Sequence, residues 1–263
     1  MKIPVYQVDA FTDHIFGGNP AAVVPLDEWL PEDVMQNIAR ENNLSETAFF
    51  VPEESGYHIR WFTPTVEVDL CGHATLAASH VLFIHLGYSS PVLSFSSRSG
   101  KLTVHREGMT YLLDFPADVP RPVKKEGLLM DCFDREPSEI LKGKADVLMV
   151  FEDGDYVRSV LPNLESIEIL DAEGVIITAP GREGTDFVSR FFAPQLGIPE
   201  DPVTGSAHTL LVPYWSSRLG KKALIARQVS QRGGELWCRM GEDRTQIGGE
   251  AITYLRGEIE IIL

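Results

Sequence analysis

The sequence predicts an α+β protein with two pseudo-twofold-related domains, each an antiparallel, β-barrel-like sheet around a central helix. The first observation behind this prediction is a repeat. Residues 69–75 and 201–208 share an acid, a short turn, a glycine and an alanine. Each copy follows an arginine, two aromatic residues and a proline, at 60–64 and 190–194. Two copies are too few for a solenoid, so the repeat favours two similar domains.

The second observation is that a helical run follows each copy of the repeat. Residues 72–86 are apolar nearly all round, which is typical of a buried helix, and residues 205–219 form the matching run. Short segments with strand periodicity surround both helices. A buried helix among many short antiparallel strands predicts a sheet that curls around the helix.

The remaining elements follow from periodicity and from turn residues. In the first half we expect a helix opened by a proline at 31–42, and strands at 3–11, 21–25, 48–51, 57–62, 92–95, 101–106 and 109–115. In the second half we expect a short helix at 137–143, and strands at 147–151, 157–160, 175–179, 187–192, 224–230, 235–240, 244–248 and 251–262. Three prolines within residues 116–122 place the boundary between domains 1–117 and 118–263, and a chain of 263 residues suits two domains.

Composition excludes several classes of partner. The net charge is −15 with no basic run, which argues against nucleic acid and against an anionic membrane.

The three cysteines, Cys71, Cys132 and Cys238, are widely spaced and form no CxxC pair. This spacing predicts neither a disulfide framework nor a zinc site, and it fits a reducing cytoplasm. The first nine residues do not have the pattern of a signal peptide.

Gly72 and Gly205 stand at the two expected helix starts. The free N–H groups and the positive dipole end of a helix favour an anion, so two converging helix starts would hold a small carboxylated molecule. The alternative interpretation is structural: the glycines serve the turns, and Ser206 caps its helix.

Three further residues are candidates for proton transfer. Glu46 precedes an apolar strand, and a carboxylate in a partly apolar cleft suits general acid/base catalysis. His73 follows the first turn glycine and can shuttle a proton or bind an anion. Asp201 precedes Pro202, which favours an extended backbone, and can accept a hydrogen bond. The alternatives are a solvated acid, a half-exposed histidine at a helix start, and an ordinary loop acid.

Weaker candidates are His208 and Asp69, together with the arginines Arg60 and Arg190. We expect the two arginines to pair with carboxylates of the scaffold.

Five ordered motifs resemble the PhzF family, the phenazine-biosynthesis-like isomerases. They are DAFT with GGNP (9–12 and 17–20), LSETAF (44–49), RWFTP (60–64), CGHAT (71–75) and EDPVTGSA (200–207). The resemblance covers nearly the whole chain. It implies the diaminopimelate-epimerase-like fold, a site in the cleft between the domains, no metal or organic cofactor, and a homodimer.

The resemblance also implies roles for individual residues. Glu46 matches the general acid/base of the family, and Gly72 and Gly205 match its helix-start glycines. The other matched site residues are His73, Asp201 and Ser206.

One position departs from the pattern of the related epimerases, which use a thiol before each turn glycine. Here the first position is Cys71 and the second is Thr204. A hydroxyl is a far weaker base than a thiolate, so the two-thiol mechanism is incomplete. The resemblance, together with this departure, implies a cofactor-independent isomerase that moves a proton within a small carboxylated, cyclic or amino-acid-like substrate. Two alternatives stay open: an amino-acid epimerase or racemase, and a non-catalytic metabolite-binding protein with the same fold.

Overall fold

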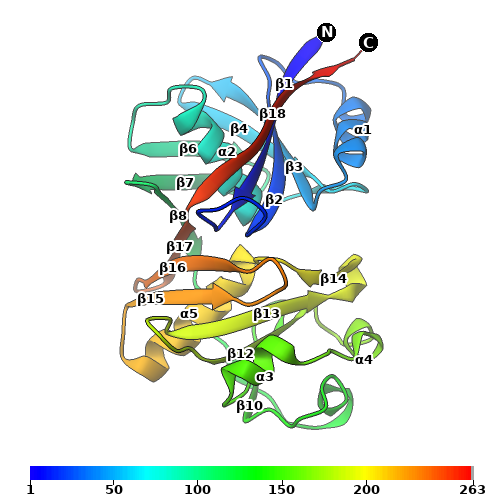
Figure 1. Ribbon diagram of the computed structural model, residues 1–263, viewed down its shortest axis with the longest axis vertical. Coiled ribbons are helices and arrows are strands. Elements are labelled where there is room, and N and C mark those ends of the chain that lie inside the picture. Colours follow the sequence, from blue (N-terminus) through cyan, green and yellow to red (C-terminus); the bar gives the residue numbers. More distant parts are fainter. Residues whose placement is uncertain (262–263) are drawn as a thin grey trace. The chain divides into compact units, whose positions relative to one another are not determined.

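The computed structural model describes residues 1–261 and divides into two compact units (Figure 1). The first unit comprises Met1–Asp114 together with the segment from Gly248 onward, and the second comprises Phe115–Ile247. Within residues 1–261 no helix has the length and apolarity needed to span a membrane.

The first unit is a mixed sheet with two helices. Its strands pair in the order β18-β1-β2-β3-β4-β6-β7-β8, and β5 pairs with the outer part of β4. The bounds are β1 (Lys2–Ala10), β2 (Asn19–Pro25), α1 (Glu32–Asn42), β3 (Glu46–Glu53), β4 (Gly56–Phe62), β5 (Glu67–Val68), α2 (Gly72–Ile84), β6 (Val92–Ser97), β7 (Gly100–Glu107), β8 (Thr110–Pro116) and β18 (Ala251–Glu260).

Two neighbouring pairs in this sheet are parallel, which differs from the purely antiparallel expectation. β2 pairs with β3 and β4 pairs with β6 in the parallel sense. Parallel neighbours need a long crossover, usually through a helix, and α1 and α2 are the helices of these two crossovers. The parallel β2–β3 pair has a consequence for the site, because it puts the beginnings of both strands at the same edge of the sheet.

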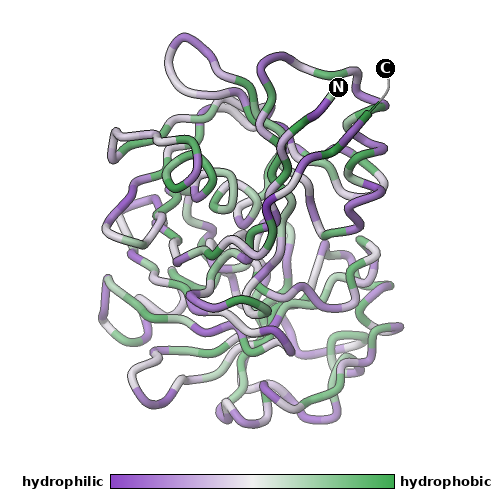
Figure 2. Tube along the Cα trace, turned by 45° about the horizontal axis from the view of Figure 1, so that its top comes forward, coloured by the Kyte–Doolittle hydropathy of each residue, from purple (hydrophilic) through white to green (hydrophobic). Residues whose placement is uncertain are grey.

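Helix α2 is the centre of the first unit, as the sequence predicts. It packs against β1, β2, β3 and β18, and its residues from His73 to Phe83 are all buried. Figure 2 shows α2 as a mainly green and white coil, whereas α1 has a mixed colouring. A helix buried on all sides needs no polar face, which explains why its sequence shows none.

The second unit has the same plan around α5. Its strands pair in the order β9-β10-β11-β12-β13-β15-β16, with β14 also on β13. The bounds are β9 (Arg121–Pro122), β10 (Glu139–Lys142), β11 (Val147–Val150), α3 (Gly154–Ser159), α4 (Leu164–Glu168), β12 (Val175–Pro180), β13 (Phe187–Ala193), β14 (Ile198–Asp201), α5 (Gly205–Leu219), β15 (Ala223–Gln228), β16 (Gly234–Met240) and β17 (Arg244–Gly249), with 3₁₀ turns at Gly127–Met130 and Pro194–Leu196.

Alternation along β13 gives this sheet two covered faces. Phe187 stacks on Trp215 of α5, with ring centroids 5.6 Å apart. Val188 and Phe192 instead join the apolar cluster that includes Val157 of α3. The period of two in a strand sends successive side chains to opposite faces, so one strand supports both layers.

Two expected elements of the second half have the other secondary structure. Residues 139–142 form strand β10 rather than a helix. The reason is pairing with distant segments, because β10 pairs antiparallel with β11 and with β9. Residues 154–159 form helix α3 rather than a strand, because the side chain of Asp153 accepts a hydrogen bond from the N–H of Asp155 and caps the first turn.

The division of the chain also differs from the expected domains 1–117 and 118–263. The first boundary falls after Asp114, close to the prolines that predict it, but the segment from Gly248 onward belongs to the first unit. The reason is strand pairing, since β18 lies antiparallel to β1 along its whole length.

Candidate functional site

The beginnings of three elements meet in the first unit. Glu46 is the first residue of β3 and lies opposite Ala21 of β2. Asn19 is the first residue of β2, and α2 begins at Gly72. Because β2 and β3 are parallel and α2 packs on both, side chains from the three beginnings lie close together.

The start of α2 is built by Cys71, whose backbone is extended at φ −143° and ψ 113°. Its carbonyl accepts hydrogen bonds from the N–H of Thr75 at 3.1 Å and from the Thr75 hydroxyl at 2.6 Å. The Cys71 side chain makes no capping hydrogen bond to the helix. Cys71 therefore does not cap the helix with its side chain. An anion-binding helix start likewise offers its first N–H groups to the ligand rather than to a cap.

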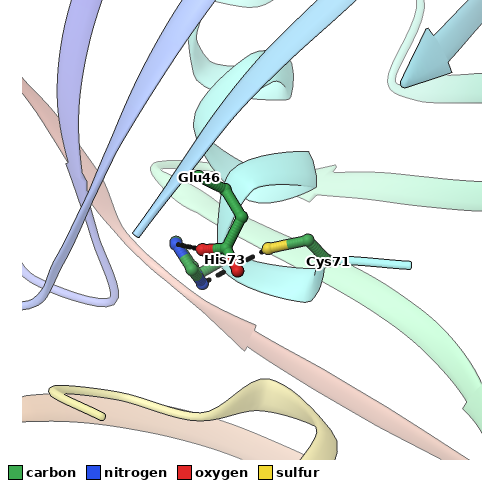
Figure 3. Close-up of side chains that lie close together, drawn as sticks. All are labelled: Glu46, Cys71 and His73. Carbon is green, nitrogen blue, oxygen red and sulfur yellow. Dashed lines mark hydrogen bonds and ion pairs between the residues drawn. The ribbon is translucent and has the colours of Figure 1, made fainter. Parts of the chain in front are cut away.

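Glu46, His73 and Cys71 form one cluster (Figure 3). Oε2 of Glu46 lies 3.1 Å from Nε2 of His73, and Sγ of Cys71 lies 3.5 Å from Nδ1 of the same ring. The glutamate contact is an ion-pair distance that does not meet hydrogen-bond geometry. Catalytic hydrogen bonds are often poorly aligned without substrate and tighten when it binds.

The neighbours of His73 indicate which ring nitrogen carries the proton when the ring is neutral. The amide Nδ2 of Asn19 lies 3.3 Å from Nδ1, on the same nitrogen that the Cys71 thiol faces. An amide nitrogen donates, so in the neutral ring Nδ1 accepts and Nε2 carries the proton, whereas in the imidazolium both ring nitrogens carry one. The Nε2–H group therefore faces the carboxylate of Glu46.

Charge and burial act together on this cluster. The side chains of Glu46 and His73 are 13% and 7% exposed, so their charges are little screened. Burial opposes the charged form of His73, but its neighbours Cys71 and Glu46 raise its pKa well above its usual value. Burial and the Glu46 carboxylate also raise the pKa of the Cys71 thiol. At neutral pH the sulfur is consequently a thiol, and Glu46 is the negative charge that favours imidazolium.

The matching helix start in the second unit is organised by Thr204. Thr204 is extended at φ −111° and ψ 103°, and α5 begins at Gly205. Its hydroxyl donates to Oδ2 of Asp201 at 2.5 Å. Both Asp201 and Thr204 are buried. Ser206 is exposed and lies inside the helix, so Ser206 is not the cap of the structural alternative.

Gln228 holds this loop in place, and sequence reasoning did not find it. Its Oε1 accepts from the N–H of Thr204 at 2.9 Å. Its Nε2 donates to the carbonyl of Asp201 at 2.8 Å and to the hydroxyl of Thr204 at 3.2 Å. Gln228 is the last residue of β15, in phase with the buried residues Leu224 and Ala226. A polar residue in phase with apolar ones is the signal that could have revealed it.

The two arginines of the repeat are scaffold residues, as expected. Arg60 forms two hydrogen bonds of 2.7 Å to the carboxylate of Glu67, and Arg190 forms bonds of 2.7 and 2.9 Å to Glu200. Each bidentate arginine–carboxylate pair holds in place the short strand that leads to a helix start. His208 is also structural, because its Nδ1 donates to the Thr204 carbonyl at 2.8 Å.

The candidate residues thus fall into two sets. Glu46, Gly72 and His73 come together at the start of α2, and Asp201, Gly205 and Ser206 surround the start of α5.

A family model described as "Phenazine biosynthesis-like protein" (PhzC-PhzF) matches residues 8–257. The chain belongs to this family. An uncharacterized isomerase of Pseudomonas aeruginosa is 49% identical to this PhzF-family chain, and the match covers 99% of the chain and 100% of the relative. The crystal structure of a PhzF-family protein of Enterococcus faecalis matches at a TM-score of 0.97 and 47% identity, over 99% and 100% of the two chains.

A more distant match shows that an epimerase has a similar fold. A hydroxyproline epimerase of Agrobacterium vitis matches with a TM-score of 0.58 at 11% identity, over 98% of this chain and 91% of that one. The predicted family and the predicted α+β, epimerase-like fold are confirmed. The name of the Pseudomonas relative supports a function of the isomerase type.

Proposed function

We propose that this chain is a cofactor-independent isomerase of the PhzF type, in which Glu46 is the general acid/base. The substrate is a small carboxylated molecule, cyclic or amino-acid-like, and the reaction moves a proton from one of its atoms to another. The observation that carries the proposal is the 3.1 Å approach of the Glu46 carboxylate to Nε2 of His73, beside the start of α2.

The chemistry needs one group that takes a proton and later returns it. The carboxylate of Glu46 removes a proton from an activated carbon of the substrate, and the resulting carboxylic acid delivers it to a second position. His73 holds the carboxylate in place through its Nε2–H group and stabilises the ionised form before the transfer. A positioned acid/base of this kind contributes about 10²–10⁴-fold in rate.

The carboxylate of the substrate needs an anion site, and the start of α2 supports one. The extended backbone of Cys71 and the absence of a side-chain cap support an anion site at the start of α2. The family resemblance assigns Asp201, Gly205 and Ser206 to the same reaction. The hydroxyproline epimerase that shares the fold has trans-4-hydroxy-L-proline bound, a small carboxylated molecule, although that likeness is one of fold alone.

A two-thiol epimerase is less well supported. The position that matches Cys71 is Thr204, and its hydroxyl donates its proton to Asp201. A hydroxyl engaged in this way is no base near neutral pH. A single carboxylate that acts first as base and then as acid fits the residues better.

The test is exchange with heavy water, because proton transfer to and from Glu46 would introduce deuterium. The chain is incubated with a panel of carboxylated metabolites in deuterated buffer, and deuterium uptake and product formation are followed by mass spectrometry. We expect exchange with at least one substrate, and a loss of about 10²–10⁴-fold in Glu46→Gln. Glu53→Gln is the matched control, since Glu53 also faces a histidine, with Oε1 3.8 Å from Nδ1 of His58.

Two results would count against the proposal. Full exchange activity in folded Glu46→Gln would remove this residue from the mechanism. Saturable binding of a metabolite with no exchange would favour the non-catalytic binding protein.

We also propose a homodimer, the commonest closed oligomer, and light scattering that gives only monomer mass over a range of concentrations would contradict it.

A further inference from the structure

We propose that strand β18 pairs with β18 of a second copy of this chain, in an antiparallel ladder centred on Gly257. The interaction surface is the outer edge of β18 from Leu255 to Glu260. This inference names the interface of the proposed homodimer and therefore rests on that dimer, but it does not rest on the proposed catalysis.

The backbone of β18 has one side that β1 does not use. Met1 and Ile261 exchange two backbone hydrogen bonds, of 2.7 and 3.0 Å. Opposed residues of antiparallel strands alternate between exchanging hydrogen bonds and not exchanging them, and the register continues with Lys2 opposite Glu260. Every second residue from Ile261 back to Leu255 therefore bonds to β1. The residues between them direct their N–H and C=O groups away from β1.

Three residues carry these outward groups, namely Arg256, Glu258 and Glu260. Within residues 1–261, the strand in register with them is β1, and the backbone hydrogen bonds between separate segments do not reach their outward groups. All three residues are exposed. Figure 1 shows β18 in red beside β1 in dark blue. A strand edge of this kind is a template for pairing with another chain.

The charges along this edge are complementary to themselves. When two copies pair antiparallel around Gly257, Arg256 of each copy lies opposite Glu258 of the other. Both residues have outward backbone groups, so each opposed pair also exchanges two backbone hydrogen bonds. Opposite charges on directly opposed residues stabilise a ladder, and like charges destabilise it.

Neighbouring registers lack this match. Backbone hydrogen bonds require outward residues opposite outward residues, so the centre of the ladder has to coincide with a residue. A centre at Arg256 places this arginine opposite itself, and a centre at Glu258 does the same with the glutamate. A centre at Ile259 places Glu258 opposite Glu260. Gly257 is the centre that brings opposite charges together without a pair of like charges.

The other face of the ladder is apolar in the same register. Leu255 of each copy lies opposite Ile259 of the other, and Ile259 already packs against the apolar cluster that includes Met35 of α1. Gly257 lies between them, where the twofold axis passes. The fold of one chain does not require glycine here, because its φ is not positive and an added Cβ would meet no atom closer than 3.7 Å. Glycine inside a strand is typical of a site where another backbone approaches closely.

The test is the dissociation constant of the dimer, measured for the full chain by sedimentation velocity over a dilution series. Arg256→Glu leaves two negative residues at the centre of the edge, and Glu258→Arg leaves two positive ones. Each variant alone should dimerise about 10–100-fold more weakly than the parent chain, because two attractive pairs become repulsive. An equimolar mixture of the two variants should form a mixed dimer that is tighter than either homodimer, since every opposed pair again has opposite charges.

Glu258→Pro tests the backbone part of the interface. The N–H group of Glu258 points away from β1, so proline removes a donor that one chain does not use, and edge strands tolerate proline. We expect the dimer to weaken at least about 10-fold, because hydrogen bonds between the copies are lost. Arg227→Glu is the control and should leave the dimer unchanged. It reverses an exposed charge on β15, which has paired strands on both sides. Circular dichroism verifies that each variant is folded.

Two results would overturn the inference. If the charge variants dimerise as the parent chain does and their mixture is no tighter, the homodimer has another interface. If the parent chain stays monomeric up to about 100 μM, well above the dissociation constants of interfaces of standard size, the homodimer itself is wrong and the charges only protect the edge from pairing. Neither result decides the deuterium experiment, which measures turnover and not assembly.

Discussion

Nε2 of His73 lies 3.1 Å from Oε2 of Glu46, which joins the start of helix α2 to the start of strand β3. On the other side of the same ring lies the thiol of Cys71, 3.5 Å from Nδ1. The carboxylate and the thiol are thus both candidates for the proton-transfer group. The two assignments predict opposite effects on activity when Cys71 and Glu46 are substituted.

We predict that Cys71→Ser retains substantial activity and that Glu46→Gln does not. The raised pKa of Cys71 keeps the sulfur protonated, and a buried unpaired cysteine commonly acts as a small packing residue. A paired assay of both variants on one substrate, with circular dichroism for folding, measures this. If Cys71→Ser is folded but inactive while Glu46→Gln still turns over, the thiol is the base.

His73 should give the chain an alkaline limit of stability. Burial opposes charge on the ring, but Cys71 and Glu46 raise its folded-state pKa well above the unfolded value of 6.5. The stability contributed by imidazolium is therefore complete below pH 6.5 and is lost as pH rises through the folded-state pKa. Denaturant unfolding from pH 6 to 10 should show this decline, and His73→Asn should flatten it. An unchanged slope in the variant would contradict the assignment.

His80 and His208 should give the chain an acid limit. Burial lowers the pKa of each from 6.5 to about 4. The unfolded chain then binds more protons between these values, so stability falls as pH drops from 6.5 toward 4. Each shift corresponds to about 3 kcal/mol. Urea unfolding of the parent chain, His80→Gln and His208→Gln across this range measures it, and we expect a shallower acid decline in both variants.

Gln228→Met should destabilise the second unit. The variant keeps the size of the side chain but removes the acceptor of the Thr204 N–H and one donor to the Asp201 carbonyl. A buried N–H group that loses its acceptor costs about 1–3 kcal/mol. Gln36→Met is the control, because Gln36 makes a single side-chain bond, to the Thr63 carbonyl at a half-buried position. Equal losses of unfolding free energy in both variants would show that Gln228 has no special part.

The repeat made the fold predictable. Buried helices at 72–86 and 205–219 and most of the strands follow from periodicity, and both glycines stand at helix starts. Residues 137–143 were harder, because Ile140 and Leu141 are both buried and a short apolar pair fits a helix as well as a strand.

The site was predictable in part. The positions of Glu46 and His73 came from motifs, but their 3.1 Å contact depends on the parallel pairing of β2 and β3, which no local pattern specifies. The role of Gln228 could not be predicted for a similar reason. It depends on which loop lies beside the end of β15, and a short stretch of sequence does not specify contacts between distant segments.

The return of strand β18 to β1 sets an order of events during synthesis. Residues 115–247 form a continuous unit, so the whole of this unit is available for folding once residue 247 has left the ribosome. The first unit cannot, because β1 waits for its neighbour β18, and the amino group of Met1 is bound by the carbonyl of Ile261 at 2.7 Å. The part of the chain made first is therefore the part completed last, and until then β1 presents an unpaired edge to other chains.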